Sequence, residues 1–223
     1  MLENSDKVVL LSKYHIIDYK KLIKKGDFSK LIAITNPLTF PNVNIEISEK
    51  QNEIIFVGRL DYASKRVDRV LKVWRKLQEY NKNWSLTIVG DGQDRSRLEQ
   101  LSKKLCLERI TFVGHTDPKQ YYQRAKILLM TSNFEGTPMV IPEAMAYGVT
   151  PIIMNSFAGV NDIIKNGYNG LLTKPFSTKD MINSIQLLID NQNKLNEISN
   201  NATNIIKNIE NNILLSEWNK IIG

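Results

Sequence analysis

The feature that most constrains the fold is a series of short, continuously apolar segments that alternate with helical patterns. The segments are residues 54–57, 86–89, 110–113, 127–130 and 150–154, with a shorter one at 170–172. Strands covered by helices on both faces are apolar throughout, whereas strands with one wet face alternate. Between the first two segments, Val67, Val70, Leu71, Trp74 and Leu77 recur at helical spacing. The sequence therefore predicts an α/β fold with a doubly wound parallel sheet of the Rossmann-like kind.

Glycine or small polar residues follow four successive strands of this predicted sheet. Right-handed crossovers bring the carboxyl ends of parallel strands to one edge, where such sheets bind ligands. Glycine there permits positive φ and close approach of a ligand to the backbone. The residues at these strand ends are Gly58-Arg59, Gly90-Asp91-Gly92, Gly114-His115 and the segment 132–138. We expect the binding site at this edge.

Two segments flank the predicted sheet. Residues 1–50 hold two further apolar runs around a lysine-rich helix, which is one βα(β) unit and too small to form a sheet alone. The C-terminal segment is helical, and Ser177 is expected to cap its first helix together with Asp180. Asn200-Asn201 and Asn211-Asn212 are expected to interrupt the helices that follow.

Composition narrows the setting of the protein more than its chemistry. The single cysteine, Cys106, excludes an internal disulfide, fits a reducing compartment and is expected to lie in the core. No apolar run has the length of a membrane span, and the first residues are too polar for a secretory signal. A cytoplasmic protein is predicted, with association at the inner membrane face as a further option. The net charge of +7 suits a phosphate-bearing ligand, an anionic membrane or nucleic acid. Nucleic acid is disfavoured, because arginine forms no concentrated face and no aromatic platform accompanies it.

Arg59 and Lys65 are candidates for an anion clamp. A guanidinium offers a rigid fork to phosphate oxygens and an ammonium acts as a mobile point charge. Placed at a strand end and near the next helix start, the two side chains can reach the same anion. The spacing alone fits two unrelated surface cations equally well.

The segment from Glu135 to Glu143 is the second candidate. Thr137 is a good N-cap and Pro138 suits the first helical position, so a helix is predicted to begin there. Its N-terminus would form an anion site. Carboxylates repel phosphate, so Glu135 and Glu143 are interpreted as acceptors for hydroxyl groups on either side of it. A helix with dipole-offsetting acids is the alternative.

Taken together, these motifs resemble the group 1 glycosyltransferases, the retaining family 4. The motifs are Gly58-Arg59-Leu60 with Lys65, Val89-Gly90-Asp91-Gly92, Phe112-Val113-Gly114, Glu135-Gly136 and Pro142-Glu143-Ala144-Met145-Ala146-Tyr147-Gly148. The resemblance spans residues 30–180, and the two glutamates with seven residues between them are its most specific part. It implies one half of the GT-B architecture, in which two Rossmann-like domains face a cleft. Lys65-Arg66 departs from the Lys-Gly that many relatives have.

The resemblance also implies roles for individual residues. Arg59 and Lys65 would bind the donor diphosphate and stabilise its developing charge, and Glu135 would contact the donor sugar, so these three are the expected catalytic residues. Glu143 would hold the ribose hydroxyls. No metal or separate cofactor is expected. The full expected donor site is Gly58, Arg59, Lys65, Gly114, His115, Glu135, Gly136, Thr137, Pro138, Met139, Val140 and Glu143.

The same resemblance predicts three parts. Residues 1–40 would be the remnant of an N-terminal acceptor domain with its linker, 41–176 the nucleotide-sugar-binding domain, and 177–223 the C-terminal helices. The chain would then be a truncated or split glycosyltransferase of polysaccharide biosynthesis. It would serve hexosyl transfer from a UDP- or GDP-sugar to a glycan or lipid-linked acceptor, and would be inactive in transfer by itself. A non-catalytic sugar-nucleotide-binding fragment and an epimerase or phosphorylase of the same architecture remain alternatives, the epimerase weakened by the paired glutamates.

Overall fold

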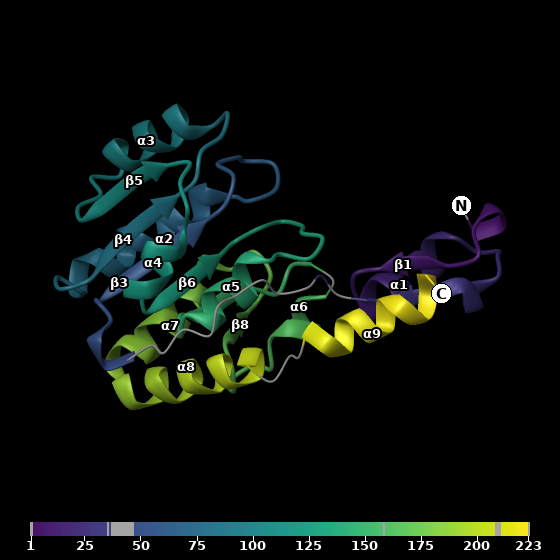
Figure 1. Ribbon diagram of the computed structural model, residues 1–223. Coiled ribbons are helices and arrows are strands. Elements are labelled where there is room, and N and C mark those ends of the chain that lie inside the picture. Colours follow the sequence, from purple (N-terminus) through teal and green to yellow (C-terminus); the bar gives the residue numbers. More distant parts are fainter. Residues whose placement is uncertain (1, 35, 37–46, 158, 208–210, 223) are drawn as a thin grey trace.

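A six-stranded parallel sheet forms the centre of the protein, as the apolar segments predict. The computed structural model describes residues 2–34, 36, 47–157, 159–207 and 211–222. The strand order is β5-β4-β3-β6-β7-β8, and every adjacent pair is parallel (Figure 1). The strands are β3 (Glu53–Val57), β4 (Ser85–Val89), β5 (Ile110–Gly114), β6 (Ile127–Met130), β7 (Thr150–Met154) and β8 (Leu171–Thr173).

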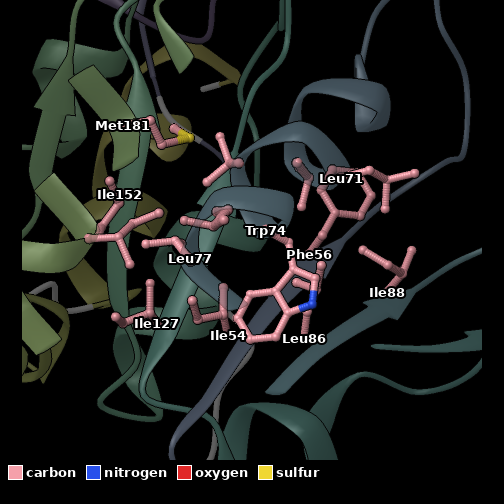
Figure 2. Packing of buried hydrophobic residues seen from close by; sticks show 14 of the residues in the cluster. Ile54, Phe56, Leu71, Trp74, Leu77, Leu86, Ile88, Ile127, Ile152 and Met181 are labelled. Atoms are coloured by element: carbon pink, nitrogen blue, oxygen red, sulfur yellow. The ribbon is translucent and has the colours of Figure 1, made fainter. Parts of the chain in front are cut away.

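Helices cover both faces of this sheet, which explains why its strands are apolar throughout. In β3, Ile54 and Phe56 pack into one large buried cluster and Ile55 and Val57 into another. Figure 2 shows the first cluster, in which Trp74 lies among the strand residues. The helices are α2 (Val67–Tyr80), α3 (Arg95–Lys104), α4 (Lys119–Arg124), α5 (Val140–Ala146), α6 (Val160–Ile163), α7 (Thr178–Asp190), α8 (Gln192–Lys207) and α9 (Asn211–Ile222).

The N-terminal segment forms a separate small unit at one end of the molecule (Figure 1). Its parallel strands β1 (Val8–Leu10) and β2 (Leu31–Ala33) form a two-stranded sheet joined by helix α1 (Lys13–Leu22). Short 3-10 turns, η1 (Leu2–Asn4) and η2 (Phe28–Lys30), flank these elements. This is the predicted βαβ unit. The predicted boundary at residues 40 and 41 lies outside the described residues, so the division into three parts stays a prediction.

Three predictions about local structure have clear outcomes. Ser177 caps α7, because its hydroxyl accepts a hydrogen bond from the Asp180 amide at 3.2 Å. The expected break at Asn200-Asn201 is wrong: both residues lie inside α8, whose apolar stripe packs into the core and outweighs the small helix propensity deficit of asparagine. Cys106 is not a core residue. It is exposed, with φ of 51°, just after α3 ends. Among the described residues, no helix is long and apolar enough to cross a membrane.

Lys50 is a buried lysine that joins the chain before the sheet to helix α4. It follows the turn η3 (Ile47–Glu49), and its Nζ donates to the carbonyl oxygens of Tyr122 at 2.6 Å, Gln123 at 3.1 Å and Ala125 at 2.8 Å. These carbonyls belong to the last turn of α4, where a cation offsets the helix dipole. Burial lowers the pKa of Lys50 from 10.5 to about 7, against the opposing charge of Glu53.

This depressed pKa predicts a specific pH dependence of stability. Between pH 7 and 10.5 the unfolded chain binds more protons at Lys50 than the folded chain, so the free energy of unfolding rises with pH. The slope is at most about 1.4 kcal/mol per pH unit. Urea denaturation across this range should show that Lys50→Met loses the slope, while Lys104→Met, at an exposed lysine, keeps it. Identical slopes in all three proteins would contradict the assignment.

Candidate functional site

The order of the strands reverses between β3 and β6, which lie side by side in the sheet. From β3 the chain moves outward to β4 and β5, and from β6 it moves the other way to β7 and β8. The loops that leave β3 and β6 therefore diverge to opposite faces and leave a crevice between them. Ligands of open α/β sheets bind at such a switch point, outside the carboxyl ends of the strands.

An ion pair spans this crevice. Lys65, from the loop after β3, donates through Nζ to both carboxylate oxygens of Glu135, from the loop after β6, at 2.6 and 2.8 Å. The side chains are 20% and 10% exposed. The Ser132 hydroxyl also donates to Glu135 at 2.6 Å and fixes the carboxylate. The structure thus brings together two predicted site residues that are 70 positions apart in the chain.

Arg59 stands beside this pair but is held by a different group. Its Nε donates to Asp61 at 2.8 Å, and its side chain is 70% exposed. Asp61 is buried and also accepts from the Ser64 amide and hydroxyl and from the Lys65 amide. Burial alone would raise the pKa of Asp61, but hydrogen bonds from Ser64 and Arg59 hold it well below its usual range. One carboxylate therefore organises both predicted cations.

The loop that follows Glu135 lines a cavity of about 320 Å³. Gly136, Thr137, Pro138 and Met139 form one wall, and the opposite wall comes from residues 11–13 of the N-terminal unit. The Thr137 hydroxyl oxygen is buried and has no hydrogen-bond partner among the described residues. The predicted phosphate-binding segment is therefore close to open space, and it also carries a donor that a ligand oxygen can satisfy.

Helix α5 begins later than predicted. It spans Val140–Ala146, its N-cap is Met139, and no side chain caps it. The expectation that Thr137 is the N-cap and Pro138 the first helical residue is wrong, because the chain keeps an irregular course to Met139. Pro142 falls in the first turn, where it removes no helical hydrogen bond. An anion here would meet the loop of residues 136–139 and the start of a seven-residue helix.

Glu143, the second predicted glutamate, has a tyrosine as its partner. Tyr122 of α4 donates its hydroxyl to the Glu143 carboxylate at 3.0 Å and stacks on Tyr147 with 5.8 Å between ring centroids. Burial, followed by the Glu143 charge, raises the pKa of Tyr122 far above its ordinary value, so the phenol remains a donor. Glu143 lies outside the Lys65–Glu135 pair but is held ready to accept another hydrogen bond.

The glycines at the strand ends adopt positive φ, as predicted, for a partly different reason. Gly90 has φ of 138°, and a Cβ there would lie 1.9 Å from the Gly58 carbonyl oxygen. It is therefore required by contact between two loops of the protein. Gly136 differs, because a Cβ there would meet nothing within 4 Å. Gly114 has φ of 81°, and the neighbouring His115 is exposed at the β5 edge.

Sequence reasoning missed the groups that support the site. Asp61, Ser64, Ser132 and Tyr122 were not singled out, yet they hold Arg59, Lys65, Glu135 and Glu143 in place. The spacing of Asp61 and Ser64 is typical of a side chain that accepts from a backbone amide in a turn, a signal that was available. The Tyr122 contact joins two helices and has no local signal. No group of three potential metal ligands occurs in the described part of the chain.

Comparison with known proteins gives a consistent result. The family described as glycosyl transferases group 1 matches residues 42–205. An uncharacterized glycosyltransferase of Haemophilus influenzae is 29% identical over 219 residues, which is 97% of this chain and 61% of that protein. An α-1,4-N-acetyl-D-galactosaminyltransferase of Campylobacter jejuni, whose name gives a diNAcBac-PP-undecaprenol-linked GalNAc disaccharide as its acceptor, is 28% identical over 98% of this chain and 60% of its own length.

Solved structures share the fold at lower identity. Staphylococcus aureus TarM, bound to UDP, fondaparinux and α-GlcNAc-glycerol, has a TM-score of 0.88 and 21% identity over 98% of this chain and 44% of its own. Anabaena HepE, bound to UDP and glucose, has a TM-score of 0.82 and 20% identity over 99% of this chain and 64% of its own. The chain spans about three fifths of the length of the first two curated relatives.

Proposed function

The chain belongs to the group 1 glycosyl transferases, and we propose that it binds the nucleotide-sugar donor for a retaining hexosyl transfer. The donor is a UDP- or GDP-sugar, and the acceptor is a glycan or a lipid-linked glycan. Contacts to the acceptor would come largely from an N-terminal domain of the kind that the longer relatives have room for. The proposal concerns the whole transferase, of which these residues supply the donor side.

The ion pair at the switch point is the observation that carries this proposal. Lys65 and the neighbouring Arg59 supply positive charge at the crevice, and a diphosphate would compete with Glu135 for the Lys65 ammonium. Charge that develops on the diphosphate as the glycosidic bond breaks would be stabilised by these fixed cations. Glu135, released or shared, would accept hydrogen bonds from the donor sugar hydroxyls.

The remaining predicted contacts extend the donor on both sides. The amides of residues 136–140 and the free Thr137 hydroxyl would meet phosphate or sugar oxygens beside the cavity. Glu143, aligned by Tyr122, would accept from the ribose hydroxyls. Gly114 and His115, on the outer strand β5, would border the nucleobase. The UDP in the TarM and HepE structures and the PP-undecaprenol in the Campylobacter relative's name support this choice of donor and acceptor classes.

Thermal unfolding with nucleotides tests the proposal. UDP or GDP at a hundred times its dissociation constant should stabilise the fold by about 2.7 kcal/mol, which raises Tm by roughly 5 to 10 °C in a domain of this size. UMP and GMP should give a much smaller shift at the same concentration, because they lack the second phosphate. The absence of a shift with either diphosphate at millimolar concentration would overturn the proposal. Retention would be read from the anomeric configuration of the product, using a longer form that carries an acceptor domain.

A further inference from the structure

We infer that Asp61 is a positioning residue for the diphosphate, which it does not touch itself: it aims the Arg59 guanidinium and the Lys65 loop at the same point. This inference rests on the proposed donor site and adds a residue to it. Asp61 comes two positions after Arg59 and lies at the turn between β3 and α2.

The two oxygens of Asp61 do different work. Oδ1 accepts from the Ser64 amide at 2.6 Å and from the Lys65 amide at 3.1 Å, and so closes the turn that carries Lys65. Oδ2 accepts from Arg59 Nε at 2.8 Å. The Ser64 hydroxyl lies within hydrogen-bond distance of both oxygens, at 2.7 and 2.8 Å. The carboxylate is only 4% exposed, so solvent does not compete for these contacts.

The contact through Nε determines what Arg59 presents. A guanidinium has five donors in a rigid plane, and Asp61 takes the one nearest the chain. Within the described residues, no acceptor is recorded for either Nη group of Arg59, although its Nε is fixed. The two outer nitrogens are thus left to bind phosphate oxygens side by side, which is the geometry in which arginine recognises phosphate most strongly.

Holding the side chain in advance lowers the entropy cost of binding. An arginine loses up to about 2 kcal/mol of rotamer entropy when it becomes fixed. Arg59 is 70% exposed, so little else in its surroundings restricts it. Because Asp61 restricts it before the ligand arrives, less of that entropy is lost on binding.

Asp61→Asn separates the two roles of the carboxylate. The asparagine carbonyl can replace Oδ1 and keep the turn, while its amide, placed at Oδ2, meets Arg59 Nε as donor against donor. The contact with Arg59 is lost with little change in size. UDP dissociation constants are measured by calorimetry for the wild type, Asp61→Asn, Arg59→Ala and the double variant.

Positioning through Arg59 predicts that Asp61→Asn weakens UDP about fivefold to tenfold, in line with the entropy it saves. It also predicts that the double variant binds no more weakly than Arg59→Ala alone. Independent effects that multiply in the double variant would overturn the inference, as would unchanged UDP affinity in Asp61→Asn while Arg59→Ala binds more weakly. If Arg59→Ala itself leaves UDP affinity unchanged, the proposed donor site fails instead.

A second measurement needs no ligand and covers the case in which Asp61→Asn does not fold. Hydrogen exchange at the Arg59 Nε–H, followed by ¹⁵N NMR, should be slow in the wild type and faster in Ser64→Ala, which removes one hydrogen bond that orients Asp61. The exchange rate of the exposed Arg97 Nε–H, outside this loop, serves as the internal reference. An Arg59 Nε–H that exchanges as fast as a free arginine side chain in the wild type would overturn the inference.

Discussion

Replacing Gly90 by alanine is expected to destabilise the fold more than any other glycine substitution at the binding edge. The new Cβ would lie 1.9 Å from the Gly58 carbonyl oxygen, and φ of 138° is strained for any residue with a side chain. The neighbouring atoms are backbone, which cannot move aside without displacing the end of β3. Strained φ and overpacking cost about 1 to 3 kcal/mol each, so a loss of roughly 3 to 5 kcal/mol is expected. Chemical denaturation of the purified variant measures it.

Gly136→Ala is the matched control for this prediction. It lies at the same sheet edge, but its Cβ would enter open space, so its effect on stability should stay within about 1 kcal/mol. Under the proposed function, the same methyl group would intrude where the donor phosphates approach the backbone, so UDP binding should weaken while the fold is retained. Equal stability losses in the two variants would show that strand-end glycines are interchangeable here and would contradict the geometry.

Lys65→Met should produce the largest loss of nucleotide binding. A charge-assisted hydrogen bond contributes about 1.5 to 3 kcal/mol, so the UDP dissociation constant should rise about tenfold to a hundredfold. The same variant leaves Glu135, 10% exposed, without its cation. Since this pair is neither fully buried nor on the surface, a stability loss of about 1 to 3 kcal/mol is expected. Calorimetry and urea denaturation give the two quantities separately.

A double variant separates the structural effect from the binding effect. Lys65→Met with Glu135→Gln removes both charges and keeps a side chain that can still accept from Ser132, so most of the lost stability should return. Nucleotide binding should stay weak, because the cation is still absent. Recovery of both properties together would mean that the lysine serves only to neutralise Glu135, and the diphosphate assignment would fail.

The fold was largely predictable because its signals are local. A strand covered on both faces is apolar at every position, and the order of such segments with intervening helices leaves few topologies besides a doubly wound sheet. The strand-end glycines and Arg59, Lys65 and Glu135 could be singled out from their places after the strands. Helix limits were less predictable, since Thr137 has every local feature of an N-cap and yet lies three residues before the helix. Asn200 and Asn201 likewise sit within α8 because burial of its other face outweighs their own preference.

By itself, then, the sequence determined the parallel sheet, the edge at which a ligand would bind and the residues with suitable chemistry there. These properties depend on hydrophobic periodicity and on residue type, which are written locally along the chain. Only the tertiary structure decided which of those residues meet. The Lys65–Glu135 pair, the sharing of Asp61 between Arg59 and the Lys65 loop, the Tyr122–Glu143 contact and the need for glycine at Gly90 all depend on where separate segments are brought by the packed core. Hydrogen bonds and steric contacts act over a few ångströms, so sequence spacing leaves them open until the sheet and its helices have fixed the distances.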